Sequence, residues 1–335
     1  MSEKSFRDKI CVEQILPHHQ EELDSLRVSS SSYSQFDRLR AAFFTKKIWP
    51  AGAKVRYYFY PGSDRIPRTA MTSLVDEVEH QGGSVDIDPL QKEVGNMSVT
   101  DAITEIIKKR IEPISGLKFI YVEQPHKANI RISFDPDGGA WSLVGTDCLH
   151  LQTGATMNLG WFDVPTVLHE FGHVLGMVHE HSNPNGNPIK WDKKAVYKWA
   201  EETQGWNKTQ TDKNILVKYE HNQVNGSSFD PLSIMLYFFP GSLTTNHKGT
   251  HQNLRLSGED VLWISKFYPQ SKVDVNNFYE RIYGKSLQSS EEQSVQAAKE
   301  IEEDDENSSM HIYILIFIII VLITLGLYLV SKRKK

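Results

Sequence analysis

The sequence predicts an α+β fold, followed by a separate apolar helix close to the C-terminus. Several short stretches rich in aromatic and β-branched residues have the pattern of strands, and a helix is predicted to begin at Asp163 with a proline in its first turn. Residues 312–330 are uncharged and almost wholly apolar. The composition, 39% hydrophobic and 24% charged residues, is that of a globular protein, and the net charge of −5 gives no indication of nucleic-acid binding.

The individual elements follow from residue preferences, turn residues and helix caps. Thr100 is the expected N-cap of the second helix, and Ser257 with Asp260 three residues later predicts a capping-box start for the last helix of the folded part. Residues 61–97 have a mixed pattern and are interpreted as an insertion. Strands are predicted at 55–60, 117–122 and 129–134, extended pieces at 141–145 and 155–160, and helices at 70–80, 100–110, 192–203 and 257–267.

The stretch H-E-F-G-H-V-L-G-M-V-H-E-H contains the most specific chemical signal in the chain. On a helix His169 and His173 lie nearly above one another, so their imidazoles point to one place. Gly176 permits a left-handed backbone that ends the helix, and His179 then approaches from another direction. Three histidines with one open position are the ligands of catalytic zinc, and Glu170 is close enough to reach a metal-bound water. The alternative, a core helix that buries three histidines without a common partner, is energetically costly.

Together with residues 233–237 (S-I-M-L-Y), this motif resembles the astacin branch of the metzincin zinc proteases. Weaker similarity is found in W-P-A-G at residues 49–52, in W-S-L-V-G at 141–145 and in the stretch 155–161, so that the resemblance covers roughly residues 48–269. It implies a metzincin-like α+β fold with a twisted mixed sheet, an active-site helix and an irregular C-terminal subdomain, separated by a cleft.

The resemblance also implies the roles of individual residues. His169, His173 and His179 match the three ligands of one catalytic Zn²⁺. Glu170 matches the general base, and Tyr237 matches a tyrosine that ligates zinc at rest and swings to stabilise the oxyanion. The expected substrate is a peptide or protein, because the Met-turn and tyrosine argue against a zinc hydrolase that acts on non-peptide bonds.

Further matches concern the support of the site. Met235 matches the Met-turn residue beneath the metal, Glu180 matches a glutamate that contacts a mature N-terminus, and residues 156–159 are expected to form the edge strand that pairs with substrate. The sequence departs from the family pattern at Leu236, where a histidine is usual. His150, His181, His221, His247 and His251 either line the cleft or lie on loops, and we favour loops.

Composition divides the chain into five parts. We expect an N-terminal extension at 1–46, the catalytic domain at 47–270, a polar acidic stalk at 271–310, a transmembrane helix at 311–331 and a basic tail at 332–335. Residues 312–330 would place the protein in a lipid bilayer as a single-pass C-terminal anchor. Two cysteines, Cys11 and Cys148, and the lack of an N-terminal apolar run favour a catalytic domain facing the cytosol, although the basic tail favours the opposite orientation.

The main alternative is a catalytically inactive, membrane-anchored module that binds peptides. Such proteins usually lack the base or one metal ligand, whereas this sequence retains Glu170 and all three histidines. The sequence therefore favours a zinc endopeptidase.

Overall fold

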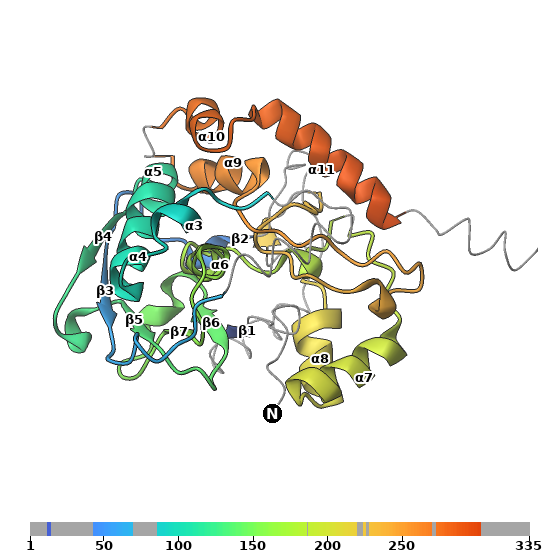
Figure 1. Ribbon diagram of the computed structural model, residues 1–335, viewed down its shortest axis with the longest axis horizontal. Coiled ribbons are helices and arrows are strands. Elements are labelled where there is room, and N and C mark those ends of the chain that lie inside the picture. Colours follow the sequence, from blue (N-terminus) through green and yellow to red (C-terminus); the bar gives the residue numbers. More distant parts are fainter. Residues whose placement is uncertain are drawn as a thin grey trace, which may run out of the picture.

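The computed structural model describes residues 12–14, 43–69, 86–185, 187–219, 224–225, 228–269 and 273–302. Its first half is built on a six-stranded mixed sheet in the order β1-β6-β7-β5-β3-β4 (Figure 1). Only β6 and β7 pair antiparallel within this sheet. The strands predicted between residues 55 and 160 are all found, with ends that differ by at most two residues. The strands of the sheet are β1 (Val12–Gln14), β3 (Lys54–Phe59), β4 (Lys118–Tyr121), β5 (Ile130–Ser133), β6 (Ala140–Leu143) and β7 (Met157–Leu159).

The position of residues 156–159 differs from the prediction. β7 pairs with β5 on one side and with β6 on the other, so it is an inner strand and not the edge of the sheet. The reason is that residues 140–143 return antiparallel to β7 and cover its outer side. The outer side of β6 is in turn paired in parallel with β1, which comes from the predicted N-terminal extension.

The helices beside the sheet are α3 (Leu90–Glu93), α4 (Val99–Ile106), α5 (Glu112–Ser115) and α6 (Val164–Val174), with a π-helical turn at Ile107–Ile111 between α4 and α5. The N-cap of α4 is Ser98 and not Thr100, because the Ser98 hydroxyl accepts from the Asp101 N–H and also donates to the Asp101 carboxylate. Ala102, Ile103 and Ile106 are buried, as their spacing predicts.

Helix α6 is buried on all sides and is held at both ends. The Asp163 carboxylate caps it by accepting the Thr166 N–H at 2.7 Å. At its other end the Trp49 indole N–H donates to the Val174 carbonyl and the Tyr268 hydroxyl donates to the Leu175 carbonyl, both at 2.8 Å. These two side chains satisfy carbonyls that a helix end leaves without partners.

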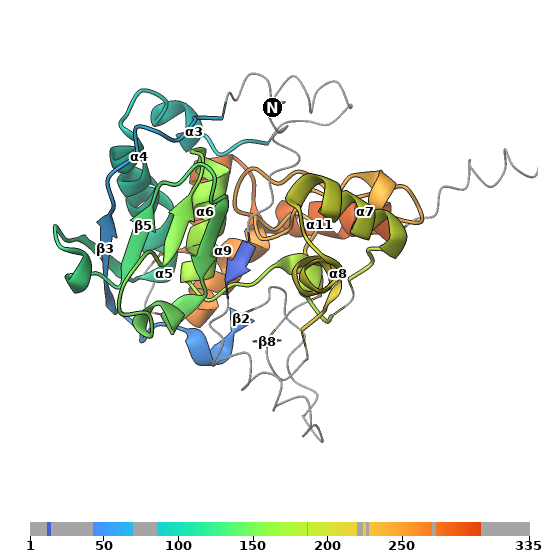
Figure 2. The same ribbon diagram turned by 90° about the horizontal axis from the view of Figure 1, so that it is seen from below.

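The second half contains α7 (Lys193–Gln204), α8 (Lys208–Thr211), a π-helical turn at Asp212–Leu216 and α9 (Gly258–Phe267). The predicted capping box of Ser257 and Asp260 is present at the start of α9. Figure 2 shows α7 and α8 on the far side of α6 from strands β3 and β5. The remaining elements are the ribbon β2 (Phe43–Phe44) with β8 (Val224–Asn225) and 3₁₀ turns at Thr45–Lys47, Pro125–Lys127, Gly145–Leu149, Glu180–Ser182 and Gly241–Leu243.

The stretch expected to be a polar stalk is corrected by the structure for most of its length. Helices α10 (Val275–Tyr283) and α11 (Leu287–Glu302) form there and pack against α9 (Figure 1). Both helices are polar on average, but α10 buries Phe278 and Tyr279 and α11 buries Ala297 and Ile301. A few apolar positions at helical spacing therefore attach these helices to the domain, and average composition does not reveal them.

Several expectations lie wholly or partly outside the described residues. These are the predicted helix at 70–80, most of the N-terminal extension, part of the insertion at 61–97 and everything after residue 302, including the predicted anchor at 312–330. Among the described residues, no helix is long and apolar enough to cross a membrane.

Candidate active site

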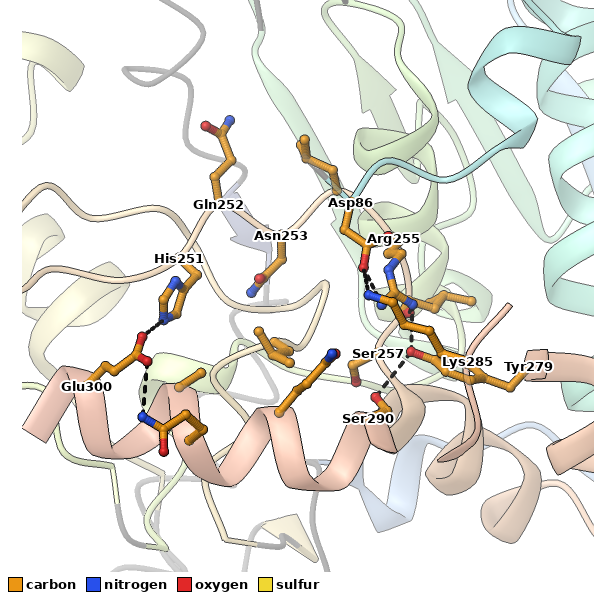
Figure 3. A pocket seen from close by; sticks show the side chains of 16 residues that line it. Asp86, His251, Gln252, Asn253, Arg255, Ser257, Tyr279, Lys285, Ser290 and Glu300 are labelled. Carbon is orange, nitrogen blue, oxygen red and sulfur yellow. Dashed lines mark hydrogen bonds and ion pairs between the residues drawn. The ribbon is translucent and has the colours of Figure 1, made fainter. Parts of the chain in front are cut away.

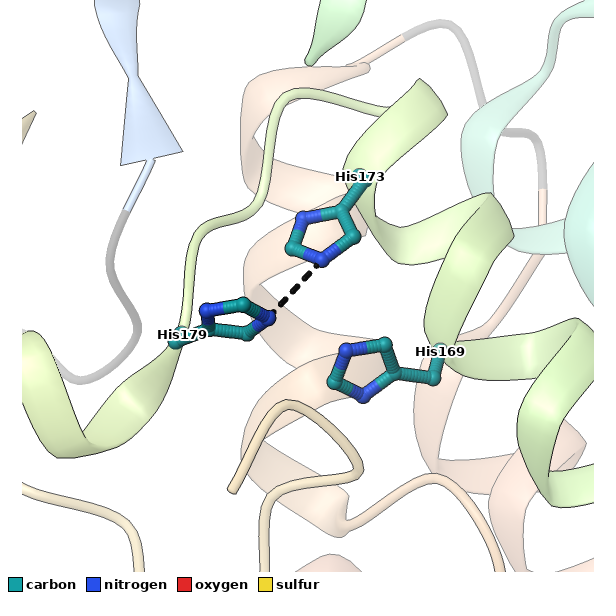
Figure 4. A group of neighbouring side chains, drawn as sticks. All are labelled: His169, His173 and His179. Carbon is teal, nitrogen blue, oxygen red and sulfur yellow. Dashed lines mark hydrogen bonds between the residues drawn. The ribbon is translucent and has the colours of Figure 1, made fainter. Parts of the chain in front are cut away.

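The three motif histidines meet at one place, as Figure 4 shows. His169 and His173 come from successive turns of α6, and His179 comes from the segment after the helix. Gly176, with φ of 93°, turns the chain between them. One ligand nitrogen from each ring lies within 4.8 Å of the others, and all three side chains are buried.

Backbone carbonyls orient two of these rings. His169 donates from Nδ1 to the Ile234 carbonyl at 2.8 Å, and His173 donates from Nδ1 to the Met177 carbonyl at 2.9 Å. With the proton on Nδ1, the Nε2 lone pair of each ring points to the shared centre. Burial lowers the pKa of His169 to about 4, and it lowers the pKa values of His173 and His179 well below their ordinary value. The rings are therefore neutral at physiological pH, which is the form that binds metal.

The cluster fits a tetrahedral zinc ion. The Nε2 atoms of His173 and His179 lie 3.1 Å apart, close to the ~3.3 Å expected for two nitrogens bound to one zinc at ordinary Zn–N distances. His169 Nε2 is buried and has no hydrogen-bond partner in the described part of the chain. A buried nitrogen without a partner costs free energy, and a shared cation would remove that cost.

Two further predicted residues belong to the same part of the fold. The Glu170 side chain is fully buried on α6, one residue after the first ligand. The Tyr237 hydroxyl lies 2.5 Å from His179 Nε2, and its ring stacks on the His169 imidazole with centroids 5.5 Å apart. The phenol therefore reaches the place on which the three imidazoles converge.

Comparisons with known proteins agree with this geometry. The family model described as Astacin, a family of peptidases, matches residues 94–246. A solved structure, that of myroilysin, is 30% identical with a TM-score of 0.52, and the match covers 68% of this chain and 98% of that one. The chain belongs to the astacin family. This astacin is a zinc metalloendopeptidase, and its three-histidine cluster is consistent with the zinc site.

Other solved structures resemble this astacin less closely. A crystal structure of myroilysin is 27% identical, with a TM-score of 0.41 and coverage of 78% of this chain and 99% of that one. High choriolytic enzyme 1, a hatching enzyme zinc-protease from Oryzias latipes (medaka fish), is 12% identical with a TM-score of 0.36, and the match covers 72% of this chain and 98% of that one. A search of curated protein sequences found no match.

Three consecutive residues of the turn at 233–237, next to the three histidines, belong to three separate apolar clusters. Met235 packs in the main core with the sheet and α6, Leu236 packs with Ile189, Phe229 and Ile301, and Tyr237 packs with residues of α7. Met235 also lies against the active-site helix at Gly172, where any Cβ atom would come closer than 3.0 Å to the methionine sulfur. The glycine therefore allows the turn to approach α6 closely.

The sequence did not reveal that His181 lies beside His179 and Tyr237. Its ring is buried and lies 5.3 Å from the His179 ring and 5.0 Å from the Tyr237 ring, so the preference for a loop position was wrong for this histidine. Its spacing of two residues from a ligand was the available signal. His150 and His247 are exposed, His251 is partly exposed, and His221 lies outside the described residues.

Glu180 follows the third ligand in the sequence, and its buried carboxylate is hydrogen-bonded within the protein. Its carboxylate accepts hydrogen bonds from the Asn183 amide and from the Asp230 N–H, each at 2.8 Å. Burial raises its pKa well above the ordinary value, and these two hydrogen bonds oppose the rise. The expected contact of Glu180 with a mature N-terminus remains a prediction.

Proposed function

We propose that this astacin hydrolyses peptide bonds with Glu170 as the proton carrier, Tyr237 as an oxyanion hydrogen-bond donor, and His169, His173 and His179 as the metal ligands. His169, His173 and His179 would hold the zinc ion as neutral imidazoles, and the ion would supply Lewis-acid chemistry that makes a water molecule more acidic, with a pKa towards ~7, and polarises the scissile carbonyl. Glu170 would take the proton of the attacking water and deliver it to the leaving amine. The observation that carries this proposal is the convergence of three buried imidazoles beside a buried glutamate.

Tyr237 would act on the carbonyl oxygen. This role is supported by the position of its hydroxyl at hydrogen-bond distance from His179 Nε2, beside the place where negative charge would develop. The rings of His169, His179, His181 and Phe239 surround the phenol and limit its motion.

The substrate would bind as an extended strand along β6. This strand runs antiparallel to its inner neighbour β7, and its outer side is the one that accepts another strand. In the full chain β1 is paired at this edge, so we propose that a substrate competes with the N-terminal segment for the same backbone groups.

The proposal is tested by Glu170→Gln in purified, zinc-loaded protein. We expect unchanged zinc content and a fall in kcat of about 10²–10⁴-fold on a generic unfolded protein substrate. A matched control is Glu123→Gln, because Glu123 is exposed after strand β4 and far from the histidines in sequence. Normal turnover by the zinc-loaded Glu170 variant would show that another group carries the proton.

We also propose that residues 312–330 anchor the protein in a bilayer, with the catalytic domain on the cytosolic side. The support is the uncharged apolar composition of this stretch and the low cysteine content. Protease protection of tagged termini in sealed vesicles tests both parts. Recovery of the full-length protein in the aqueous fraction would contradict the anchor, and protection of the catalytic domain would contradict the orientation.

A further inference from the structure

Helix α11 lies beyond the residues that the astacin family model matches, yet it packs against α9 and is hydrogen-bonded to Asp230. Its buried residues Ser290, Ser294, Ala297 and Ile301 are spaced three or four residues apart and so occupy one face. At the beginning of this face, the Ser290 hydroxyl accepts the Gly258 N–H at 3.1 Å. A Cβ atom at Gly258 would come within 2.7 Å of the Ser290 oxygen, so the two helices α9 and α11 touch at this glycine.

A buried hydrogen-bonded chain leads from α11 to the turn beneath the metal site. Ser294 donates to Asp230 Oδ1 at 2.7 Å, and Ser257 donates to the other oxygen of Asp230 at 2.6 Å. The Ser257 N–H then donates to Asp260 Oδ2 at 2.9 Å. All four side chains are at most 4% exposed, so water does not compete for these bonds.

This series of hydrogen bonds ends at the proposed metal ligand His169. Asp260 Oδ2 also accepts the Ile234 N–H at 2.8 Å, and Asp260 Oδ1 accepts the Ser233 hydroxyl at 2.7 Å. The Ile234 carbonyl in turn accepts the Nδ1–H of His169 at 2.8 Å. Ile234, whose carbonyl orients His169, is therefore held through its own N–H by the Asp260 carboxylate, and Asp260 is linked through Ser257 and Asp230 to α11.

A second, apolar contact joins the far end of α11 to the same turn. Ile301 is 3% exposed and packs in a cluster with Leu236, Ile189 and Phe229. The Ile301 carbonyl accepts the Asn246 amide at 2.7 Å, which fixes the end of the helix. In the sequence, Leu236 lies between Met235 and Tyr237. Met235 packs against α6 at Gly172, and the Tyr237 hydroxyl lies at hydrogen-bond distance from the ligand His179. An apolar side chain at position 236 suits the contact with Ile301.

Between these two attachments the helix is only loosely packed. A pocket of about 410 Å³ lies between α11 and residues 251–257. Figure 3 shows Arg255 and Lys285 both paired to Asp86 at one end of it, the end opposite to His251. At the opposite end His251 lies 4.0 Å from Glu300. The helix is thus held mainly through Ser290, Ser294 and Ile301.

We propose that α11 is a positioning element of the zinc site, which acts on His169 through Ser294 and on Tyr237 through Ile301. Neither residue touches the reacting atoms, so both are positioning residues. The inference rests on the proposed zinc-dependent function. It goes beyond that function because it assigns to a segment outside the matched family region a part in holding the metal.

The test compares Ser294→Ala and Ile301→Ala with two controls on the same helix. Ser289→Ala removes an exposed hydroxyl that donates to the Ser286 carbonyl of its own turn, and Val295→Ala shortens an apolar side chain that is 39% exposed. A third control, Ile130→Val in β5, removes one buried methylene remote from α11 at a typical cost of about 0.5–1.5 kcal/mol.

The measured quantities are the rate of zinc release to a competing chelator and the visible absorption spectrum of the Co²⁺-loaded protein. Loss of an outer partner of a metal ligand typically costs about 10–100-fold in affinity or activity, and since α11 acts through intermediate residues we expect about 3- to 10-fold faster release. Both α11 variants should also change the Co²⁺ spectrum. The three controls should match the wild type in both measurements.

Two results would overturn the proposal. The first is zinc release at the wild-type rate from both variants, with an unchanged Co²⁺ spectrum, while their melting temperatures fall as in Ile130→Val. The second is zinc release that is faster by the same factor in Ser294→Ala, Ile301→Ala and the control Ile130→Val. If Ile301→Ala does not fold, Ile301→Val serves in its place. Because neither readout requires peptide cleavage, a chain that binds zinc but cleaves nothing would refute the proposed function and still decide this question.

Discussion

Substitution of Gly172 by alanine tests how closely the turn packs against the active-site helix. Gly172 lies on α6 between the two helical ligands, and a Cβ atom there would meet the Met235 sulfur at less than 3.0 Å and the Met177 sulfur at 3.5 Å. Both methionines are at most 1% exposed, so neither can move into solvent. We expect the added methyl group to push the turn away from the helix.

Two opposing contributions decide the sign of the effect. Alanine in place of glycine inside a helix favours folding by about 1 kcal/mol. One extra methyl group in a well-packed core costs about 1–3 kcal/mol. Contact with a sulfur in the middle of a buried side chain puts the cost at the upper end of this range. The free energy of unfolding should therefore fall by about 1–2 kcal/mol, which corresponds to a melting temperature lower by about 2–8 °C for a domain of this size.

The assay is thermal unfolding of zinc-loaded protein in a double-mutant cycle with Met235→Ala. Met235→Ala alone should destabilise the protein by about 2–5 kcal/mol, because it leaves a cavity. In that background Gly172→Ala should be neutral or stabilising, since the clash is gone and only the helix preference remains. If the single Gly172 variant melts at or above the wild-type temperature, the close approach of helix and turn is wrong.

Three further results are expected. Tyr237→Phe should retain zinc and lower kcat by about 10-fold or more with little change in KM, measured in steady-state kinetics; equal kcat values would remove the phenol from the mechanism. Deletion of residues 1–46 should raise kcat/KM several-fold, because β1 no longer occupies the outer side of β6, and unchanged kinetics would contradict competition at that edge. Burial, chiefly, raises the pKa of Asp260 to about 7, so the folded state keeps a proton that the unfolded state loses near pH 4. Urea unfolding should show a free energy of unfolding that falls as the pH rises from 4 towards 7, and a smaller fall in Asp260→Asn; equal slopes would refute this.

Local signals in the sequence were sufficient for the elements that position the ligands. Asp163 caps α6, Gly176 ends the turn after it with a positive φ, and the four-residue spacing of His169 and His173 aligns their rings. Each of these depends on residues close together in the chain, which is why spacing alone predicts them.

Long-range contacts account for what the sequence did not reveal. The edge position expected for residues 156–159 followed from the family resemblance, whereas the place of β7 inside the sheet is set by its pairing with β5 and β6, which no local pattern specifies. Helix α11 is polar on most of its surface. Its four buried positions attach it through contacts with distant residues such as Asp230 and Leu236, and the sequence of the helix alone does not show these contacts. Ser98, and not the predicted Thr100, is the N-cap of α4. Both residue types can cap a helix, so only the position at which the helix begins in the structure distinguishes them.

The burial of Leu236 against Ile301 has a consequence for how this protease should be produced and compared. A recombinant fragment that stops at residue 270, the end of the catalytic domain predicted from the sequence, would leave Leu236, Ile189 and Phe229 facing water and would be prone to aggregate. The smallest well-folded fragment should instead extend through Glu302. Relatives with a polar side chain at the position of Leu236 should lack such a helix, or should present a polar residue from it.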